Sequence, residues 1–250
     1  NTQDDTLGEL PKITYKVQQT KIGNTPFYFN LDTSSAWFIT DLNAQNEADF
    51  FFKTSRIDFH PQLTIPLTLT PWLSMTSTVG ARETFYGRGL ETNGSEFKKL
   101  SSFTRESLDF RSIIQGPKIN KIYHSGTSST KFKHLLEPRL TYNYVPDMDE
   151  KDRLKIKIFD SIDTIGTPSN SITYEFDQRL LKRFKIGANK FQTKQILRFN
   201  VSQTYDIREA TIEKKSGEDR LPFSDLRFDL DSRPLDSIIL NADATYNFEA

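Results

Sequence analysis

The sequence predicts an all-β protein whose antiparallel strands each have one apolar and one polar face. Apolar and polar side chains alternate in many segments, as they do in strands whose two faces meet different surroundings. The spacing of an amphipathic helix is not sustained anywhere, and no window approaches the roughly 18 consecutive apolar residues of a transmembrane helix. A helical membrane protein is therefore excluded. Two arrangements remain, a soluble sandwich with a dry core and a membrane barrel with a wet lumen.

The composition narrows the classes of function. Only 36% of the 250 residues are hydrophobic, yet Phe alone occurs 20 times, which is unusual for a compact soluble core. The 33 basic residues balance the 33 acidic ones, so no net field favours nucleic acid. Because the chain has no cysteine, disulfides, cysteine-ligated zinc and thiol nucleophiles are excluded within it.

Ten segments carry the strand pattern, with boundaries good to about two to four residues. They are 12–19, 26–34, 48–59, 67–85, 103–114, 133–144, 171–183, 195–207, 224–232 and 237–249. No repeat of fixed period accompanies them, which argues against a propeller or a solenoid.

The segment 134–150, "HLLEPRLTYNYVPDMDE", illustrates the alternation. Successive side chains of a strand point to opposite faces, so its residues fall into two sets. The apolar set includes Leu136, Leu140 and Tyr142, and the polar set comprises Glu137, Arg139, Thr141 and Asn143. In a barrel the first set would face lipid and the second would face the lumen.

Two later segments repeat this division. In 195–207, Leu197 and Phe199 alternate with Arg198 and Asn200. In 237–249 the apolar set includes Leu240, Tyr246 and Phe248, and the polar set includes Asn241 and Asp243. We expect the apolar residues to be lipid-facing and the polar ones to be lumen-facing.

Short and long connections alternate with the strands. Proline-containing turns are predicted at 63–66 and 232–236, and long polar connections at 87–99, 116–130, 147–170 and 208–220. Short turns at one rim and long loops at the other are typical of outer-membrane barrels. A soluble β-protein with long loops is the alternative.

No pattern of catalytic or metal-binding residues is evident. His60, His124 and His134 lie far apart, and we expect one near a turn, one in a loop and one at a strand end. The acidic run of Asp147, Asp149, Glu150 and Asp152 lacks the glycine and the distal glutamate of a calcium loop. We therefore predict no enzymatic activity, no metal site and no cofactor.

Five stretches together resemble the barrel domain of the LptD family, the outer-membrane lipopolysaccharide-assembly proteins. They are "GNTPFYF" at 23–29, "RIDFHPQLTIPLTLTPWLSMTSTVGARETFY" at 56–86, "KHLLEPRLTYNYVP" at 133–146, "IFDSIDTI" with "NSITYEFDQRL" across 158–180, and "PFSDLRFDLDSRPLDSIILNADATYNF" at 222–248. Their order along the chain is the order found in the family.

The resemblance implies a fold and a task. The chain would be part of a very large antiparallel transmembrane β-barrel in the outer membrane of a Gram-negative bacterium. Residues 1–250 would be a portion of that barrel domain, an internal part without the gate strands or the periplasmic jellyroll. The barrel would insert lipopolysaccharide into the outer leaflet without covalent chemistry.

The resemblance also implies partners. These are lipopolysaccharide, the plug lipoprotein LptE, outer-membrane lipid, and the periplasmic bridge protein LptA, which would be reached through the jellyroll. The other functions that we keep open are another outer-membrane barrel, either a porin or a barrel hydrolase, and a soluble β-sandwich that binds a ligand.

Overall fold

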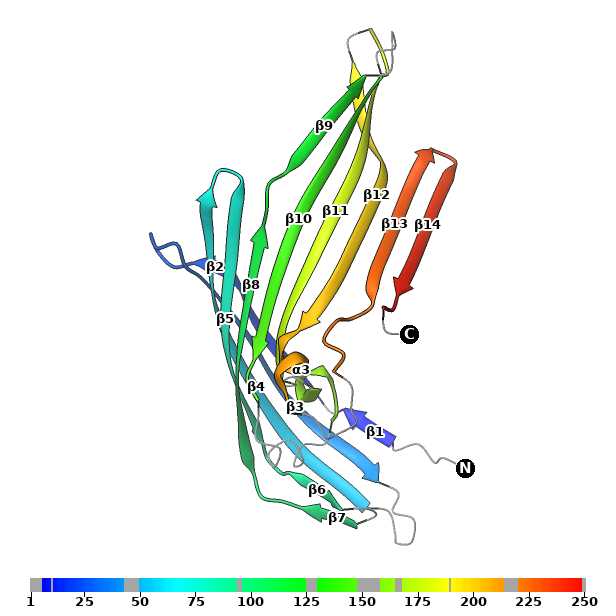
Figure 1. Ribbon diagram of the computed structural model, residues 1–250. Helices are drawn as coiled ribbons and strands as arrows, with labels where there is room; N and C mark the ends of the chain where they lie inside the picture. The colour runs from blue at the N-terminus through cyan, green and yellow to red at the C-terminus, as the bar shows by residue number, and fades with distance from the viewer. Residues whose placement is uncertain are drawn as a thin grey trace. The chain divides into compact units, whose positions relative to one another are not determined.

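A computed structural model of the chain provides the fold (Figure 1). It describes residues 6–9, 11–42, 50–93, 96–124, 130–147, 158–164, 168–188, 190–213 and 220–248. Nearly all of these residues belong to strands, and the described part contains only two short helices. The predicted all-β class is confirmed.

The strands vary widely in length. They are β1 (Thr6–Glu9), β2 (Ile13–Lys21), β3 (Tyr28–Leu42), β4 (Phe50–Thr70), β5 (Leu73–Tyr86), β6 (Leu90–Asn93), β7 (Glu96–Lys99), β8 (Phe103–Gln115), β9 (Ile119–His124), β10 (Lys131–Val145), β11 (Ser169–Lys185), β12 (Phe191–Asp206), β13 (Leu226–Leu235) and β14 (Ile238–Tyr246). The helices are α2 (Ser161–Thr164) and α3 (Ile207–Thr211).

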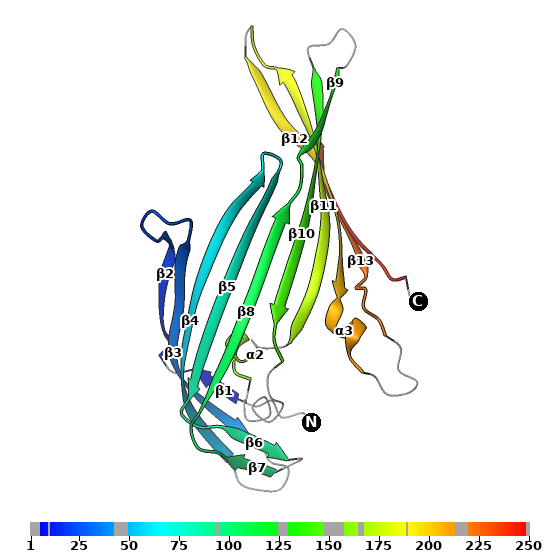
Figure 2. The same cartoon turned by 60° about the vertical axis from the view of Figure 1, so that its left-hand side comes forward.

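Twelve strands form one sheet, in which neighbours in the chain are mostly neighbours in space. The order is β1-β3-β4-β5-β8-β10-β11-β12-β13-β14; β2 also pairs with β3, and β9 with β10. Figure 2 shows β3, β4, β5 and β8 side by side in this order. The described pairings form an open path, because none of them joins β14 back to β1 or β2. Strands β6 and β7 form a separate hairpin.

Short and long connections alternate along the chain as predicted, except that the long connection predicted at 116–130 contains β9, which pairs with β10. Residues 71–72 and 236–237 join β4 to β5 and β13 to β14, and residues 186–190 join β11 to β12. The long connections are 87–102, 146–168 and 207–225, which include the β6–β7 hairpin, α2 and α3 respectively.

The two predicted short turns lie elsewhere in the structure. The turn expected at 63–66 lies inside β4, where the alternation of exposed Leu63 and buried Thr64 lets the strand continue. The chain turns instead at Pro71, whose ring fixes φ at a value suited to a turn. The second expected turn, at 232–236, begins only after Leu235.

The chain divides into two compact units, and long strands contribute to both. Unit 1 comprises residues 1–65, 77–110 and 144–169, and unit 2 comprises residues 66–76, 111–143 and 170–250.

In unit 1 the two faces of the sheet differ sharply in exposure. The whole of β3 pairs with residues 50–64 of β4, so that directly opposed residues share a face. Even-numbered side chains of β3 and β4 are buried from Ser34 to Thr40 and from Phe52 to His60. The odd-numbered face includes Trp37, which is 50% exposed, and the exposed Ile57 and Phe59.

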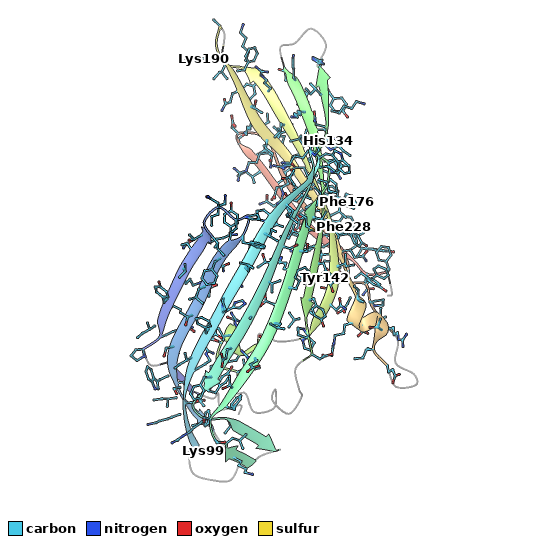
Figure 3. All side chains as sticks on the ribbon, turned by 90° about the vertical axis from the view of Figure 1, so that its left-hand side faces the viewer. Lys99, His134, Tyr142, Phe176, Lys190 and Phe228 are labelled. Atoms are coloured by element: carbon cyan, nitrogen blue, oxygen red, sulfur yellow. The ribbon has the colours of Figure 1, made fainter. Side chains whose placement is uncertain are left out.

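Unit 2 has the same two-sided order across β11, β12, β13 and β14. One row of opposed residues runs Phe176, Val201, Phe228 and Ala244, and the next runs Asp177, Asn200, Asp229 and Asp243. Phe176 and Phe228 of the apolar row are labelled in Figure 3. Because the register holds across four strands, each face keeps one chemical character.

Candidate functional site

The buried face of unit 1 is mainly polar. Its buried apolar residues are Ala36, Phe38, Phe52 and Tyr86, whereas the buried polar ones are Ser34, Thr40, Thr54, Arg56, Asp58, His60, Thr64, Thr84 and Arg105. The opposite face carries large exposed apolar side chains, among them Trp37, Ile57, Phe59 and Phe85. A soluble sandwich has the reverse arrangement, with an apolar core and a polar surface.

The segment 158–164, which contains α2, is packed against this polar face. Its Phe159 ring stacks on Phe38 with ring centroids 4.5 Å apart, and lies parallel to Phe52 at 6.4 Å. Aromatic contacts of this kind contribute about 0.5–1.5 kcal/mol beyond the area that they bury. Phe159 therefore provides the apolar part of the anchor of this segment.

Arg56 provides the charged part of the anchor. Its Nη1 and Nη2 donate to the two carboxylate oxygens of Asp160 at 2.8 and 2.7 Å, and Nη1 also lies 2.8 Å from Asp163 Oδ2. The side chains of Arg56 and Asp163 are both 0% exposed. A bidentate guanidinium pair fixes direction as well as distance, so the segment is held in one orientation.

The two aspartates also cap the short helix. Asp160 Oδ1 accepts from Ile162 N at 2.8 Å, while Asp163 Oδ2 accepts from Phe159 N at 2.9 Å and from Asp160 N at 3.3 Å. This is the reciprocal arrangement of a capping box, with aspartate in place of the usual glutamate. The same two carboxylates therefore cap the helix and bind Arg56.

Arg105 and Tyr86 hold the other side of the segment. Arg105 donates to the backbone oxygens of Ile162 at 2.7 Å and Asp163 at 3.1 Å, which have no partner within so short a helix. Tyr86 Oη donates to Asp163 Oδ1 at 2.7 Å. Asp160, Ile162 and Asp163 are therefore hydrogen-bonded to side chains of β4, β5 or β8.

The pKa of the Asp160 carboxyl group depends on its burial and on its hydrogen bonds. Burial acts to raise the pKa, but hydrogen bonds from Arg56, Lys12 and the Ile162 backbone outweigh it. The pKa of Asp160 is thus held well below its ordinary value. The carboxylate stays charged at any physiological pH.

A second polar cluster on the same face centres on His60. Its Nε2 lies 2.8 Å from Asp109 Oδ1, and Arg82 Nη2 lies 3.0 Å from its Nδ1. Gly80 makes room for the histidine and Asp109, because a Cβ at position 80 would lie 2.6 Å from His60 Nε2. Asp58, which accepts from Thr84 at 2.7 Å, balances the charge of Arg82 at 3.6 Å.

Unit 2 carries a ladder of charged side chains on its polar face. Glu137 of β10 forms ion pairs with Lys118 at 3.2 Å and with Arg179 of β11. Arg139 of β10 lies 3.4 Å from Glu175 of β11. These pairs link β10 to β11 through side chains of both charge signs.

The ladder continues into the next strands. Arg198 Nε donates to Asp177 Oδ1 at 2.8 Å, and Asn200 Nδ2 donates to Glu175 Oε1 at 2.7 Å. Arg198 also lies 3.9 Å from Asp231 of β13, which is opposed to Asn241 of β14. The polar residues of five strands are thus connected in one face.

The structure brings most of the predicted lumen-facing residues together. Glu137, Arg139, Arg198 and Asn200 belong to the ladder, and the register places Asn241 and Asp243 opposite Asp231 and Asp229 of the same face. Thr141 and Asn143 continue the same alternation in β10 and are partly buried.

The predicted lipid-facing residues form the opposite set. Leu197 and Phe199 alternate with the ladder residues of β12, and Leu240 and Tyr246 alternate with those of β14. Leu136, Leu140 and Tyr142 do so in β10, where Tyr142 is labelled in Figure 3. Phe248 lies beyond β14, and its ring contacts Tyr246 edge-on at 4.9 Å.

Sequence reasoning missed the anchor residues of unit 1. Arg56, Asp58 and His60 alternate within β4 and were detectable as a polar face, and the spacing of Asp160 and Asp163 resembles a capping box. Of the three places expected for the histidines, only the strand end is found, since His124 ends β9 while His60 and His134 lie within β4 and β10. Of the acidic run, Asp149, Glu150 and Asp152 lie outside the described residues.

The described ranges contain no group of three or more histidine, cysteine or acidic residues placed to hold a metal ion. Neither helix in the described part of the chain has the length and hydropathy needed to cross a bilayer.

A comparison of the sequence with protein-family models shows the family of the chain. The model of LptD, described as LPS transport system D, matches residues 1–250, the whole chain. The chain belongs to the LptD family. No curated protein matches the sequence.

Membership of the LptD family implies a class of function and a fold. LptD proteins act in lipopolysaccharide transport at the outer membrane of Gram-negative bacteria, and they are transport and assembly proteins, not enzymes. The family is built on a β-barrel, and the antiparallel sheet of this chain agrees with that fold, although its described pairings do not close into a ring.

Proposed function

We propose that residues 1–250 form part of the barrel wall through which lipopolysaccharide is inserted into the outer leaflet of the outer membrane. The observation that carries this proposal is the inverted sheet of unit 1, in which arginine and aspartate are buried while tryptophan and phenylalanine are exposed. A barrel wall has this arrangement because lipid surrounds it and polar groups line its lumen.

In this proposal the two faces have separate tasks. The ladder of unit 2, including Glu137, Arg139, Thr141, Asn143, Arg198, Asn200, Asn241 and Asp243, lines the lumen. The opposite set, including Leu136, Leu140, Tyr142, Leu197, Phe199, Leu240, Tyr246 and Phe248, contacts lipid. Charges of both signs on the lumenal face suit the hydrated sugars of the substrate, because they offer many weak contacts and no single strong one.

The polar face of unit 1 supplies further hydrogen-bonding capacity. Within the described residues, Arg82 Nη1 and Arg105 Nε are buried donors without a hydrogen-bond partner in the protein. Such donors need water or a ligand, since an unpaired buried donor costs about 1–3 kcal/mol. Their presence supports a hydrated lumen on this side of the sheet.

The anchored segment 158–164 is a fixed part of the lumenal surface in this proposal. Its contacts with Arg56, Arg105 and Tyr86 are buried and charge-paired, unlike those of a mobile loop. The plug lipoprotein LptE would contact the lumenal surface, and the bridge protein LptA would deliver lipopolysaccharide through a periplasmic jellyroll.

Crosslinking in intact outer membranes tests the assignment of faces. A photo-crosslinking residue in place of Arg139 should capture LptE or lipopolysaccharide, whereas the same residue in place of the adjacent Leu140 should capture membrane lipid. Equal products at both positions would refute the assignment.

Depletion tests the function itself. Loss of the protein should lower surface lipopolysaccharide and make cells permeable to hydrophobic compounds. Normal surface lipopolysaccharide after depletion would refute the proposed function whatever the crosslinking result.

A further inference from the structure

Two ranges of unit 2 carry charge of one sign. No acidic residue occurs from 111 to 136 or from 178 to 205, although the whole chain has equal numbers of basic and acidic residues. The first range contains the end of β8, β9 and the start of β10, and the second contains the end of β11 and nearly all of β12. The charge balance of the chain is therefore broken locally in favour of lysine and arginine.

Four basic side chains of these ranges form a row across neighbouring strands. They are Lys121 of β9, His134 of β10, Lys182 of β11 and Lys194 of β12. Lys121 is directly opposed to His134, and Lys182 is directly opposed to Lys194. Glu137 of β10 pairs with Arg179 of β11, and the same antiparallel register brings His134 beside Lys182. We call these four residues the basic row.

The basic row lies on the face opposite the charged ladder. His134 is three residues from Glu137 in β10, and Lys182 is three residues from Arg179 in β11, so each points away from the ladder residue of its own strand. The other two members of the row share the face of the residues that they oppose. This is the face that the proposed function assigns to lipid.

The row lies where the apolar part of this face ends. In β10, the side chains that alternate on this face from Leu136 to Tyr144 are all apolar or aromatic. This stretch has the length of about 9–11 residues that a strand needs to cross the hydrocarbon layer. His134 directly precedes it, and Figure 3 labels His134 with Tyr142 farther along the same strand. The row is therefore at the level of the lipid headgroups.

Two lysines of the row lie over aromatic rings. The ammonium of Lys121 is 5.3 Å from the centre of the Tyr123 ring, and that of Lys182 is 5.8 Å from the centre of the Phe184 ring. Aromatic girdles flank the apolar band of membrane barrels at both interfaces. Lysine and aromatic side chains together thus agree with an interfacial position of the row.

The row is only partly neutralised. Asp236, in the turn between β13 and β14, binds Lys194. Within the described residues, neither Lys121 nor Lys182 forms an ion pair. Like charges that are directly opposed destabilise a sheet, so the row gains from anions supplied by its surroundings.

The connections show which leaflet supplies these anions. The short turns 186–190 and 236–237 lie at the end of the strands that carries the row, whereas the long connection 207–225 joins β12 to β13 at the other end. Short turns of outer-membrane barrels face the periplasm. In the proposed function the row therefore meets the inner leaflet, opposite the leaflet into which lipopolysaccharide is inserted.

We propose that the basic row binds the headgroup phosphates of anionic phospholipids in the inner leaflet of the outer membrane. Lys121 and Lys182 donate charge-assisted hydrogen bonds to phosphate oxygens, while the acyl chains pack along the apolar stretch that begins at Leu136. A headgroup with an ammonium group is disfavoured, because the lysines repel it. An acidic protein fits less well, because the row borders an apolar surface. The inference rests on the proposed function, which assigns this face to lipid and this end to the periplasm.

Native mass spectrometry of the whole purified protein, with the partners that it retains, provides the test. The protein is exchanged into detergent with equal amounts of phosphatidylglycerol, which is anionic, and phosphatidylethanolamine, which has no net charge. We expect phosphatidylglycerol to be retained at least about fivefold over phosphatidylethanolamine, the preference that one lysine near an anionic surface provides. The triple variant Lys121→Gln, Lys182→Gln and Lys194→Gln should lose this preference.

Further variants separate the effect of the row from that of total charge. The matched control removes the same charge away from the row, by glutamine in place of Lys16, Lys98 and Lys99. It should keep the preference. Lys121→Gln alone, at an exposed position, should lower the preference, so the test does not depend on folding of the triple variant. Asp236→Asn should raise the preference, because it releases Lys194.

Several outcomes would overturn the inference. They are equal retention of the two lipids, a preference that survives the triple variant, displacement of the lipid by excess inorganic phosphate, and loss of lipopolysaccharide instead of phospholipid from the triple variant. An acidic protein bound at the row in place of lipid would overturn it as well.

A separate measurement distinguishes this failure from failure of the proposed function. A fluorophore at Leu140→Cys, in a background without other reactive cysteines, lies on the same face of β10 as His134. Lipids brominated in their acyl chains should quench it. Quenching without a headgroup preference would reject only the phospholipid site, and absence of quenching would reject the assignment of the whole face to lipid.

Discussion

Replacing Arg56 with methionine should release the segment 158–164 from the polar face of unit 1. Arg56 and Asp163 are fully buried and 2.8 Å apart, and Asp160 shares the same guanidinium group. Removing one partner of a buried ion pair costs about 3–5 kcal/mol, because the other charge is left uncompensated. Methionine keeps much of the side-chain volume, so the effect reports mainly on charge.

Hydrogen exchange of the backbone amides of 158–164 measures this release. Each 1.4 kcal/mol is about a tenfold change in an equilibrium constant, so exchange in Arg56→Met should be at least about a hundredfold faster. The matched control is Arg139→Met, which removes a partly exposed pair at 3.4 Å and should change local stability by at most about 1 kcal/mol.

The double variant Arg56→Met with Asp163→Asn completes the test. It removes both buried charges of the closest pair and should recover part of the lost protection. If Arg56→Met exchanged as slowly as Arg139→Met, the anchor would owe its stability to Phe159 packing, and the charge argument would be refuted.

Three further predictions concern the two faces of β14, the glycine at position 80 and the carboxylate of Asp160. Leu240→Arg should lower the free energy of unfolding in lipid by about 2–4 kcal/mol if the residue lies near the midplane, and Asp243→Arg should lower it much less; equal losses would contradict the assignment of faces. Gly80→Ala should lower it by about 1–3 kcal/mol through the clash with His60, as urea titration would reveal. Because the pKa of Asp160 is depressed in the folded protein, its contribution is complete above the ordinary value of 3.8 and is lost only as pH falls below it. Exchange of 158–164, corrected for the intrinsic rate, should therefore stay slow from pH 7 to about 4.

The alternation of faces was predictable because it depends only on the two-residue period of a strand. Arg198 and Asn200 fall on the polar face of β12, and Leu197 and Phe199 on the other, as the sequence indicates. Strand ends were less predictable. The segment 63–66 contains a proline yet continues β4, because pairing with β3 extends as far as Thr64.

The anchor of unit 1 was not predictable from local patterns. Arg56 and Asp160 are separated by 104 positions in the sequence, and no spacing rule joins a strand residue to a residue in a distant connection. The partner of each residue depends on the sheet order, which places β4, β5 and β8 side by side. The capping pattern of Asp160 and Asp163 is a local signal, but it does not identify Arg56 as their partner.

The order of strands in space has a consequence for how the wall is assembled. From β3 onward each main strand pairs with the next one in the chain, so hairpins can be added one after another with little loss of loop entropy. The tie from 158–164 back to Arg56 and Arg105 is different, because it needs β4, β5 and β8 to be in place first. A partly assembled sheet that ends before β8 lacks Arg105, so it cannot form these hydrogen bonds to the segment 158–164. When the segment 158–164 binds, β4, β5 and β8 are therefore joined by side-chain contacts as well as by backbone pairing.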